Sequence, residues 1–224
     1  MFSKASGLDG GSGVSVYHRA LGAEFARLPP LLQRYFGPIP AGAVGIGEGW
    51  YTSAGYRGPR WLRPALRLSA RRDVLFPEAA EDVPFTVENR MRCDVLQGER
   101  TFALPGVTRR MVDAMTAAGP GVIVDRLGRR GGLEVRLRPS VQPGGLRLTS
   151  TAVAIRVARV RIPLPPLARV VVDERVEPDA PRIQHVDVRV RVVLLGEVFR
   201  YTGSFVYRIR TAGEKPRSRV GSPP

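Results

Sequence analysis

The strict alternation of apolar and polar residues in the second half of the chain constrains the fold more than any other feature. Between Leu133 and Ile209 this alternation recurs in several runs, and the runs at 133–138 and 186–192 are the most regular. A period of two places apolar side chains on one face of a strand and charged side chains on the other. Successive strands of this kind form an antiparallel sheet whose dry face must be covered. The sequence therefore predicts a strongly curved sheet or a barrel.

Short helical segments precede most of these strands. Ser15 is a suitable N-cap for a first helix, and Pro30 can begin a second one. Trp61 lies in a third, amphipathic segment, with Pro64 near its start. The predicted class is α+β, with N-terminal helices, one helix after the first strand, and a curved antiparallel sheet or barrel of the lipocalin-like or helix-grip-like kind. The strands are expected at about 45–51, 83–95, 99–104, 107–115, 121–127, 132–138, 145–157, 159–164, 168–177, 183–193 and 197–209.

The length of 224 residues suits one large domain with its own core. We expect a single β-rich domain at 14–210, between a disordered Gly/Ser-rich leader at 1–13 and a disordered tail at 211–224. Cys93 is the single cysteine, so no intramolecular disulfide is expected. No early apolar run resembles a signal peptide, and no stretch approaches the roughly 20 apolar residues of a membrane-spanning helix. A cytoplasmic protein without a membrane span is therefore expected.

The formal net charge of +15 comes almost wholly from arginine, since Lys4 and Lys215 are the only lysines. The arginines are dispersed along the chain, and many occupy alternate positions of the predicted strands. A nucleic-acid surface usually combines a basic patch with stacking aromatic residues or a known motif, and neither stands out here. Nucleic acid is therefore disfavoured as a partner, whereas attraction to anionic substrates or membrane surfaces stays open.

Short segments spread along the whole predicted domain carry a family likeness, among them those at 17–22, 45–49, 81–87, 98–102 and 125–128. Together they resemble an uncharacterised bacterial family, a domain of unknown function that is found alone or fused behind saccharopine-dehydrogenase-like NAD-binding domains. Thr101 departs from the pattern of that family, which has a tryptophan there. The resemblance implies no assigned reaction, but it suggests an NAD-dependent reductase as a partner. The chain itself has no Gly-x-Gly-x-x-Gly between a strand and a helix, so no cofactor is expected.

Two glutamates fall in phase with apolar residues and are the candidate catalytic residues. If the first strand is regular, Glu48 lies on the same face as Ile46. Glu174 likewise lies on the same face as Val172 and Val176. A lone carboxylate on an apolar face is costly to bury unless it is paired or protonated, and burial raises its pKa. Each could therefore act as a general acid or base in a pocket. The alternative for both is a salt bridge to an arginine or a strand end that reaches water.

The candidate ligand contacts come from three predicted strands. Trp50 has the same phase as Glu48, and Asn89 is the polar residue on a face that Cys93 is expected to share as a small hydrophobe. The last strand presents four aromatic residues in phase around a glycine, namely Phe199, Tyr201, Phe205 and Tyr207. Aromatic residues on a concave face form a wall suited to an extended apolar ligand, although an ordinary core strand has the same pattern.

These features favour a protein that binds an apolar or amphipathic small molecule (a lipid, polyketide or terpenoid-like compound) in a barrel cavity. One alternative is a cofactor-independent cyclase or isomerase of secondary metabolism that uses the same cavity, because such catalysis needs only shape and one acid or base. Another is a partner module for an NAD-dependent reductase, which would expose an apolar patch. Two histidines and one cysteine without paired spacing predict no metal site.

Overall fold

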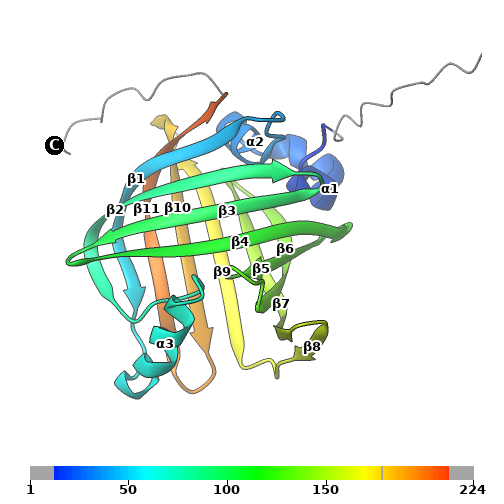
Figure 1. Ribbon diagram of the computed structural model, residues 1–224. Helices are drawn as coiled ribbons and strands as arrows, with labels where there is room; N and C mark the ends of the chain where they lie inside the picture. The colour runs from blue at the N-terminus through cyan, green and yellow to red at the C-terminus, as the bar shows by residue number, and fades with distance from the viewer. Residues whose placement is uncertain (1–12, 178, 212–224) are drawn as a thin grey trace, which may run out of the picture.

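The computed structural model of the protein describes residues 13–177 and 179–211 (Figure 1). The predicted disordered leader and tail lie outside these residues, apart from Gly13 and Thr211. The described chain forms a closed antiparallel barrel with few helices, which confirms the predicted fold class. The N-terminal helices and the helix after the first strand are also present.

The barrel is one sheet whose two edges meet. The strand order is β6-β5-β4-β3-β2-β1-β11-β10-β9-β7-β8, and a further pairing of β6 with β7 closes ten of these strands into a ring. The short strand β8 pairs with β7 outside that ring. The bounds are β1 Val44–Tyr56, β2 Ala79–Arg92, β3 Val95–Leu104, β4 Val107–Gly119, β5 Val122–Leu127, β6 Leu133–Gln142, β7 Gly145–Val157, β8 Val160–Pro163, β9 Ala168–Glu177, β10 Ala180–Val192 and β11 Gly196–Arg210.

The helices lie at the two ends of the barrel (Figure 1). One end carries α1 (Val16–Leu21), the 3₁₀ turn η1 (Gly22–Arg27) and α2 (Pro30–Phe36), and the Ser15 hydroxyl caps α1 by accepting a 3.0 Å hydrogen bond from the His18 N–H. The other end carries η2 (Arg60–Leu62) and α3 (Arg63–Ala70), and β8 lies at this same end. No helix in the described chain is long and apolar enough to cross a membrane.

Aromatic side chains fill much of the interior. The Tyr51 and Phe85 rings stack with 3.7 Å between their centroids, and Phe102 packs against Phe76 and Tyr201 at 5.0 and 5.6 Å. From α2, the Tyr35 ring contacts Phe205 and Tyr207 of β11, at 5.5 and 4.8 Å. Side chains from the N-terminal helices therefore fill the end of the barrel that carries α1 and α2.

The prediction that Glu48 and Trp50 face the interior is wrong. The glycines at 45, 47 and 49 face inward instead, and Trp50 is 44% exposed on the outer wall. A side chain at Gly47 would place its Cβ 2.6 Å from the Val87 Cγ1, and one at Gly45 would overlap the Tyr207 ring. The bare face of β1 is therefore the inner one, because β2 and β11 project large side chains across it.

The prediction that Cys93 lies on a buried strand face is also wrong. Cys93 and Asp94 form the turn between β2 and β3, and Cys93 is exposed with a φ of 51°. The expected single strand at 83–95 therefore ends at Arg92, and Val95 begins the next strand. Regular alternation through Cys93 concealed this turn.

Candidate functional site in the barrel interior

A buried carboxyl–amide pair lies on the inner face of β9 and β10. The Gln184 Nε2 donates a 2.7 Å hydrogen bond to the Glu174 Oε2, and the two residues are 0% and 7% exposed. The Gln184 Oε1 has no hydrogen-bond partner among the described residues. Glu174 thus faces inward, as predicted, but sequence reasoning missed Gln184. The available signal was that Gln184 lies on the same strand face as Val186 and Val188.

Burial governs the ionisation of this pair. Desolvation raises the pKa of Glu174 from its ordinary 4.5 to about 7, against the opposing effects of the Gln184 hydrogen bond and the Arg100 charge. A carboxyl group with a pKa near 7 can donate or accept a proton at neutral pH. The pair therefore offers both hydrogen-bonding and acid–base chemistry inside an apolar barrel.

A second polar group faces the interior from β3, β4 and β5. Arg100 forms an ion pair with Asp113, and the Asp113 side chain is 3% exposed. Asp125 is also buried, and its Oδ1 has no partner in the described chain. Burial, and then the charge of Asp113, raise the pKa of Asp125 well above its ordinary value. Sequence reasoning missed all three residues. The available signal was that each lies two residues from an apolar residue on the same strand face, namely Phe102, Met111 and Ile123.

The Arg100 side chain is only partly buried, although it lies in the middle of its strand. Its register partners Val87 and Met111 are buried on the inner face, yet the Arg100 side chain is 19% exposed. Space large enough for a water molecule therefore borders the Arg100 side chain.

Buried tyrosines also face the interior. The Tyr17 hydroxyl donates a 3.3 Å hydrogen bond to the Met115 sulfur, and burial raises the pKa of Tyr201 to about 12. Burial also raises the pKa of Tyr207 to about 12, although the neighbouring Asn89 side chain lowers it. The Tyr207 hydroxyl forms no hydrogen bond of good geometry with a described residue. The interior therefore contains several polar atoms that lack partners within the described protein.

The structure brings most of the predicted site residues together. Besides Glu174, the inward-facing ones are Asn89, Phe199, Tyr201, Phe205 and Tyr207. Glu48 instead forms a 2.8 Å ion pair with Arg208 on the outer wall, which was the alternative considered for it. Glu48 and Trp50 are therefore separated from the interior group by the sheet itself.

The inner wall changes character around the barrel. On β1, β2, β3 and β11 it is aromatic and tightly buried. On β5, β6, β7, β9 and β10 it is aliphatic, and near the α3 end its inward-facing side chains are half-buried, namely Leu127, Leu133, Val153, Val170 and Val190. A side chain that faces the barrel axis is accessible only through the interior or its mouth. The accessible part of the inner wall is therefore on its aliphatic side.

The outer surface carries two further charged features. A pocket of about 220 Å³ opens on β2, β3 and β4, but its lining charges include the 2.6 Å ion pair of Arg90 with Glu88. Glu134 on β6 is enclosed by three arginines, at 2.7 Å from Arg161, 3.1 Å from Arg156 and 3.5 Å from Arg126. Every side chain of the Glu134 cluster is therefore paired, and the outer pocket contains no buried unpartnered atom. No group of three metal-ligating side chains occurs in the described ranges.

The fold and its interior define an antiparallel β-barrel protein with a polar group enclosed by apolar walls. The chain belongs to the family described as "Domain of unknown function (DUF4166)", whose model matches residues 28–205. Among solved structures, it is similar to Rv2717c from M. tuberculosis, with a TM-score of 0.42 and 12% identity over 81% of this chain and 99% of that one. No curated protein matches the sequence.

Proposed function

We propose that the barrel binds an amphipathic small molecule, a lipid-, polyketide- or terpenoid-like compound that carries a hydroxyl group. The observation that carries this proposal is the Gln184 Oε1, a fully buried acceptor without a partner among the described residues. A buried polar atom without a hydrogen bond costs about 1–3 kcal/mol, so a ligand hydroxyl that donates to it would recover that cost. Glu174, beside it, can accept or donate a second hydrogen bond.

The aliphatic wall suits the apolar part of such a ligand. Val153, Val170 and Val190 line the accessible side, and the aromatic wall opposite offers a flat apolar surface. Arg100 provides donors, and the unpartnered Asp125 Oδ1 a further polar contact, for a second polar group farther along the barrel. An apolar ligand with polar groups at defined places fits this distribution better than a uniformly polar one.

Native mass spectrometry of the protein purified from its own host, followed by denaturing extraction, tests this proposal. We expect a co-purifying apolar molecule that carries at least one hydroxyl group. The variant Val170→Trp fills the aliphatic side and should lose the molecule, whereas Val206→Trp on the outer wall should retain it. A clean apo mass for the wild-type protein, or equal retention by the two variants, would contradict the proposal.

The raised pKa of Glu174 supports a second candidate, a cofactor-independent cyclase or isomerase. In such a reaction Glu174 would remove a proton from one carbon of the bound molecule and return it to another, so that no net redox change occurs. The variant Glu174→Gln should then bind the extracted molecule but produce no isomer of it. If wild-type protein leaves the molecule unchanged over the whole range from pH 5 to 9, the protein is a binder without this activity.

The resemblance to proteins fused behind NAD-binding domains supports a cytoplasmic NAD-dependent reductase as the enzyme that makes or consumes the ligand. Addition of the protein to such a reductase should then raise its rate of nicotinamide oxidation with the extracted molecule. An unchanged rate at saturating protein would remove this partner from the proposal.

A further inference from the structure

Exposed apolar side chains gather at the end of the barrel that carries α3 and β8. They come from three segments, the η2–α3 segment, the β7–β8 hairpin with the loop that follows, and the β10–β11 turn. Leu194 is 99% exposed, Trp61 70% and Val160 60%. We call this set the apolar rim, and its main members are Trp61, Val157, Val160, Ile162, Leu167 and Leu194.

The three segments are neighbours in space. The Val193 N–H donates a 2.7 Å hydrogen bond to the Leu167 carbonyl, which joins the β10–β11 turn to the loop after β8. The Arg57 N–H donates a 2.8 Å hydrogen bond to the Val198 carbonyl, which joins the start of the η2–α3 segment to β11. Figure 1 shows α3, the β10–β11 turn and β8 at one end of the barrel, opposite α1 and α2. The apolar rim is therefore one surface around one end of the barrel.

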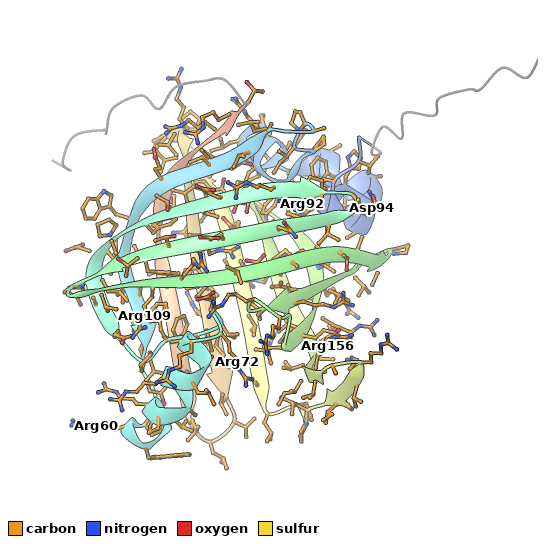
Figure 2. The ribbon with its side chains drawn as sticks, viewed as in Figure 1. Arg60, Arg72, Arg92, Asp94, Arg109 and Arg156 are labelled. Carbon is orange, nitrogen blue, oxygen red and sulfur yellow. The ribbon has the colours of Figure 1, made fainter. Side chains whose placement is uncertain are left out.

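The charge on this end is mostly positive. The segment 57–72 contains six arginines and no acidic residue, and the segment 155–169 contains four arginines and no acidic residue. Glu197, which borders the rim, is 3.7 Å from Arg57. Arg60, Arg159 and Arg169 form no ion pair with another described residue, and Figure 2 shows Arg60 projecting away from the barrel beside α3. Unpaired positive charge thus surrounds the apolar tips.

We propose that the apolar rim docks the protein on an anionic phospholipid bilayer. The apolar tips would enter the interface between headgroups and acyl chains, and the arginines would pair with lipid phosphates. The charge distribution favours this partner, because a surface without free carboxylates complements an anionic membrane. The geometry also favours it, because isolated tips such as Leu194 and Trp61 can enter a fluid layer without a matching rigid pocket.

The docked orientation would also place the accessible mouth of the aliphatic wall against the bilayer. Val153 and Val170, which line that mouth, lie on the strands that lead into and out of the β8 segment. The docking proposal does not depend on an interior ligand, and either can fail alone.

Co-sedimentation with vesicles tests the docking. We expect the wild-type protein to bind vesicles of phosphatidylcholine with phosphatidylglycerol, and to bind phosphatidylcholine vesicles much more weakly. The double variant Val160→Asp/Leu194→Asp should lose roughly tenfold or more of its partition coefficient, because two apolar anchors become charged. The matched control is Val206→Asp, an exposed valine on the outer wall of β11, which should bind like the wild type. Circular dichroism checks that all variants are folded.

The two tryptophans provide an internal comparison, because Trp50 lies on the side wall and Trp61 on the rim. With the anionic vesicles, the variant Trp50→Phe, which keeps Trp61, should show a blue shift of its emission. The variant Trp61→Phe, which keeps Trp50, should show none.

Absence of vesicle binding at low salt would overturn the proposal, as would equal binding of the double variant and the Val206→Asp control. A wild-type dimer that Leu194→Asp dissociates, without vesicle binding, would also overturn it and would assign the apolar rim to a second copy of the chain.

Discussion

The aromatic and aliphatic walls of the barrel use the same alternating pattern but produce different interiors. On the aromatic wall, the inward glycines of β1 lie under Phe205, Tyr207 and Val87, so that large side chains occupy the space that small residues leave. On the aliphatic wall, valines of β9 and β10 lie side by side, and Glu174 and Gln184 share this wall as a buried hydrogen-bonded pair.

This difference teaches that strand periodicity determines which residues face inward, whereas side-chain volume determines whether the interior is filled. A row of glycines predicts close packing only if the neighbouring strands carry bulky residues. On the aliphatic wall the half-buried valines border the accessible space, whereas Gln184 beside them is fully buried. The aromatic wall therefore stabilises the barrel, and the aliphatic wall holds the candidate site.

The largest expected effect comes from a methyl group on the aromatic wall. In Gly49→Ala the new Cβ would overlap the Ser204 carbonyl oxygen and lie 2.6 Å from the Phe205 Cα, both of which are backbone atoms. Because backbone atoms cannot rotate away, we expect a loss of about 3 kcal/mol or more in the free energy of unfolding. Urea denaturation measures this loss. Gly132→Ala, whose Cβ would have a single contact at 3.9 Å, is the control and should be nearly neutral. Similar midpoints for the two variants would refute close packing on this wall.

The next largest effect is a change of stability with pH, which Glu174 on the aliphatic wall should cause. Burial raises the pKa of Glu174 from 4.5 to about 7, so ionisation disfavours the folded state. Relative to Glu174→Gln, the wild type should be most stable below pH 4.5 and should lose roughly 3 kcal/mol as the pH rises through about 7. Thermal unfolding at pH 4 and pH 8 measures this difference, and the variant should be the more stable protein at pH 8. A difference that does not change with pH would show that Glu174 is solvated.

A smaller loss of stability is expected when the buried ion pair between β3 and β4 is broken. Asp113→Asn removes the negative partner of Arg100 and leaves its guanidinium group inside the barrel. Removing one partner of a buried pair costs about 3–5 kcal/mol, but the partial exposure of Arg100 reduces this to about 2 kcal/mol. A double-mutant cycle with Arg100→Met isolates the pair. Additive effects of the two substitutions would mean that the ion pair contributes nothing.

The smallest effect is expected on the outer wall. Glu48→Gln breaks an exposed ion pair with Arg208 and should change the free energy of unfolding by less than about 1 kcal/mol. Its unfolding midpoint should also depend on pH as that of the wild type does. A loss as large as that of Asp113→Asn would contradict the outward placement of Glu48.

Much of the fold was predictable because its signals are local. Alternation identified the strands from β4 to β11, Ser15 and Pro30 marked the starts of helices, and Glu174 was placed on the inner face by its phase with Val172. Asn89 and the aromatic residues of β11 were placed correctly for the same reason. Gln184 and Arg100 were missed because polar side chains at inward positions look like ordinary interruptions of an apolar pattern.

The sequence by itself determined the curved antiparallel sheet, its helices and the two sets of residues that share a face on each strand. It did not determine which set of β1 faces inward, since a period of two is equally consistent with both orientations. The tertiary structure decided this, because Phe205, Tyr207 and Val87 from neighbouring strands fill the bare face and force Glu48 to the outside. It also brought Glu174 and Gln184 together and gathered three separate loops into the apolar rim, since strand register and barrel closure are long-range properties.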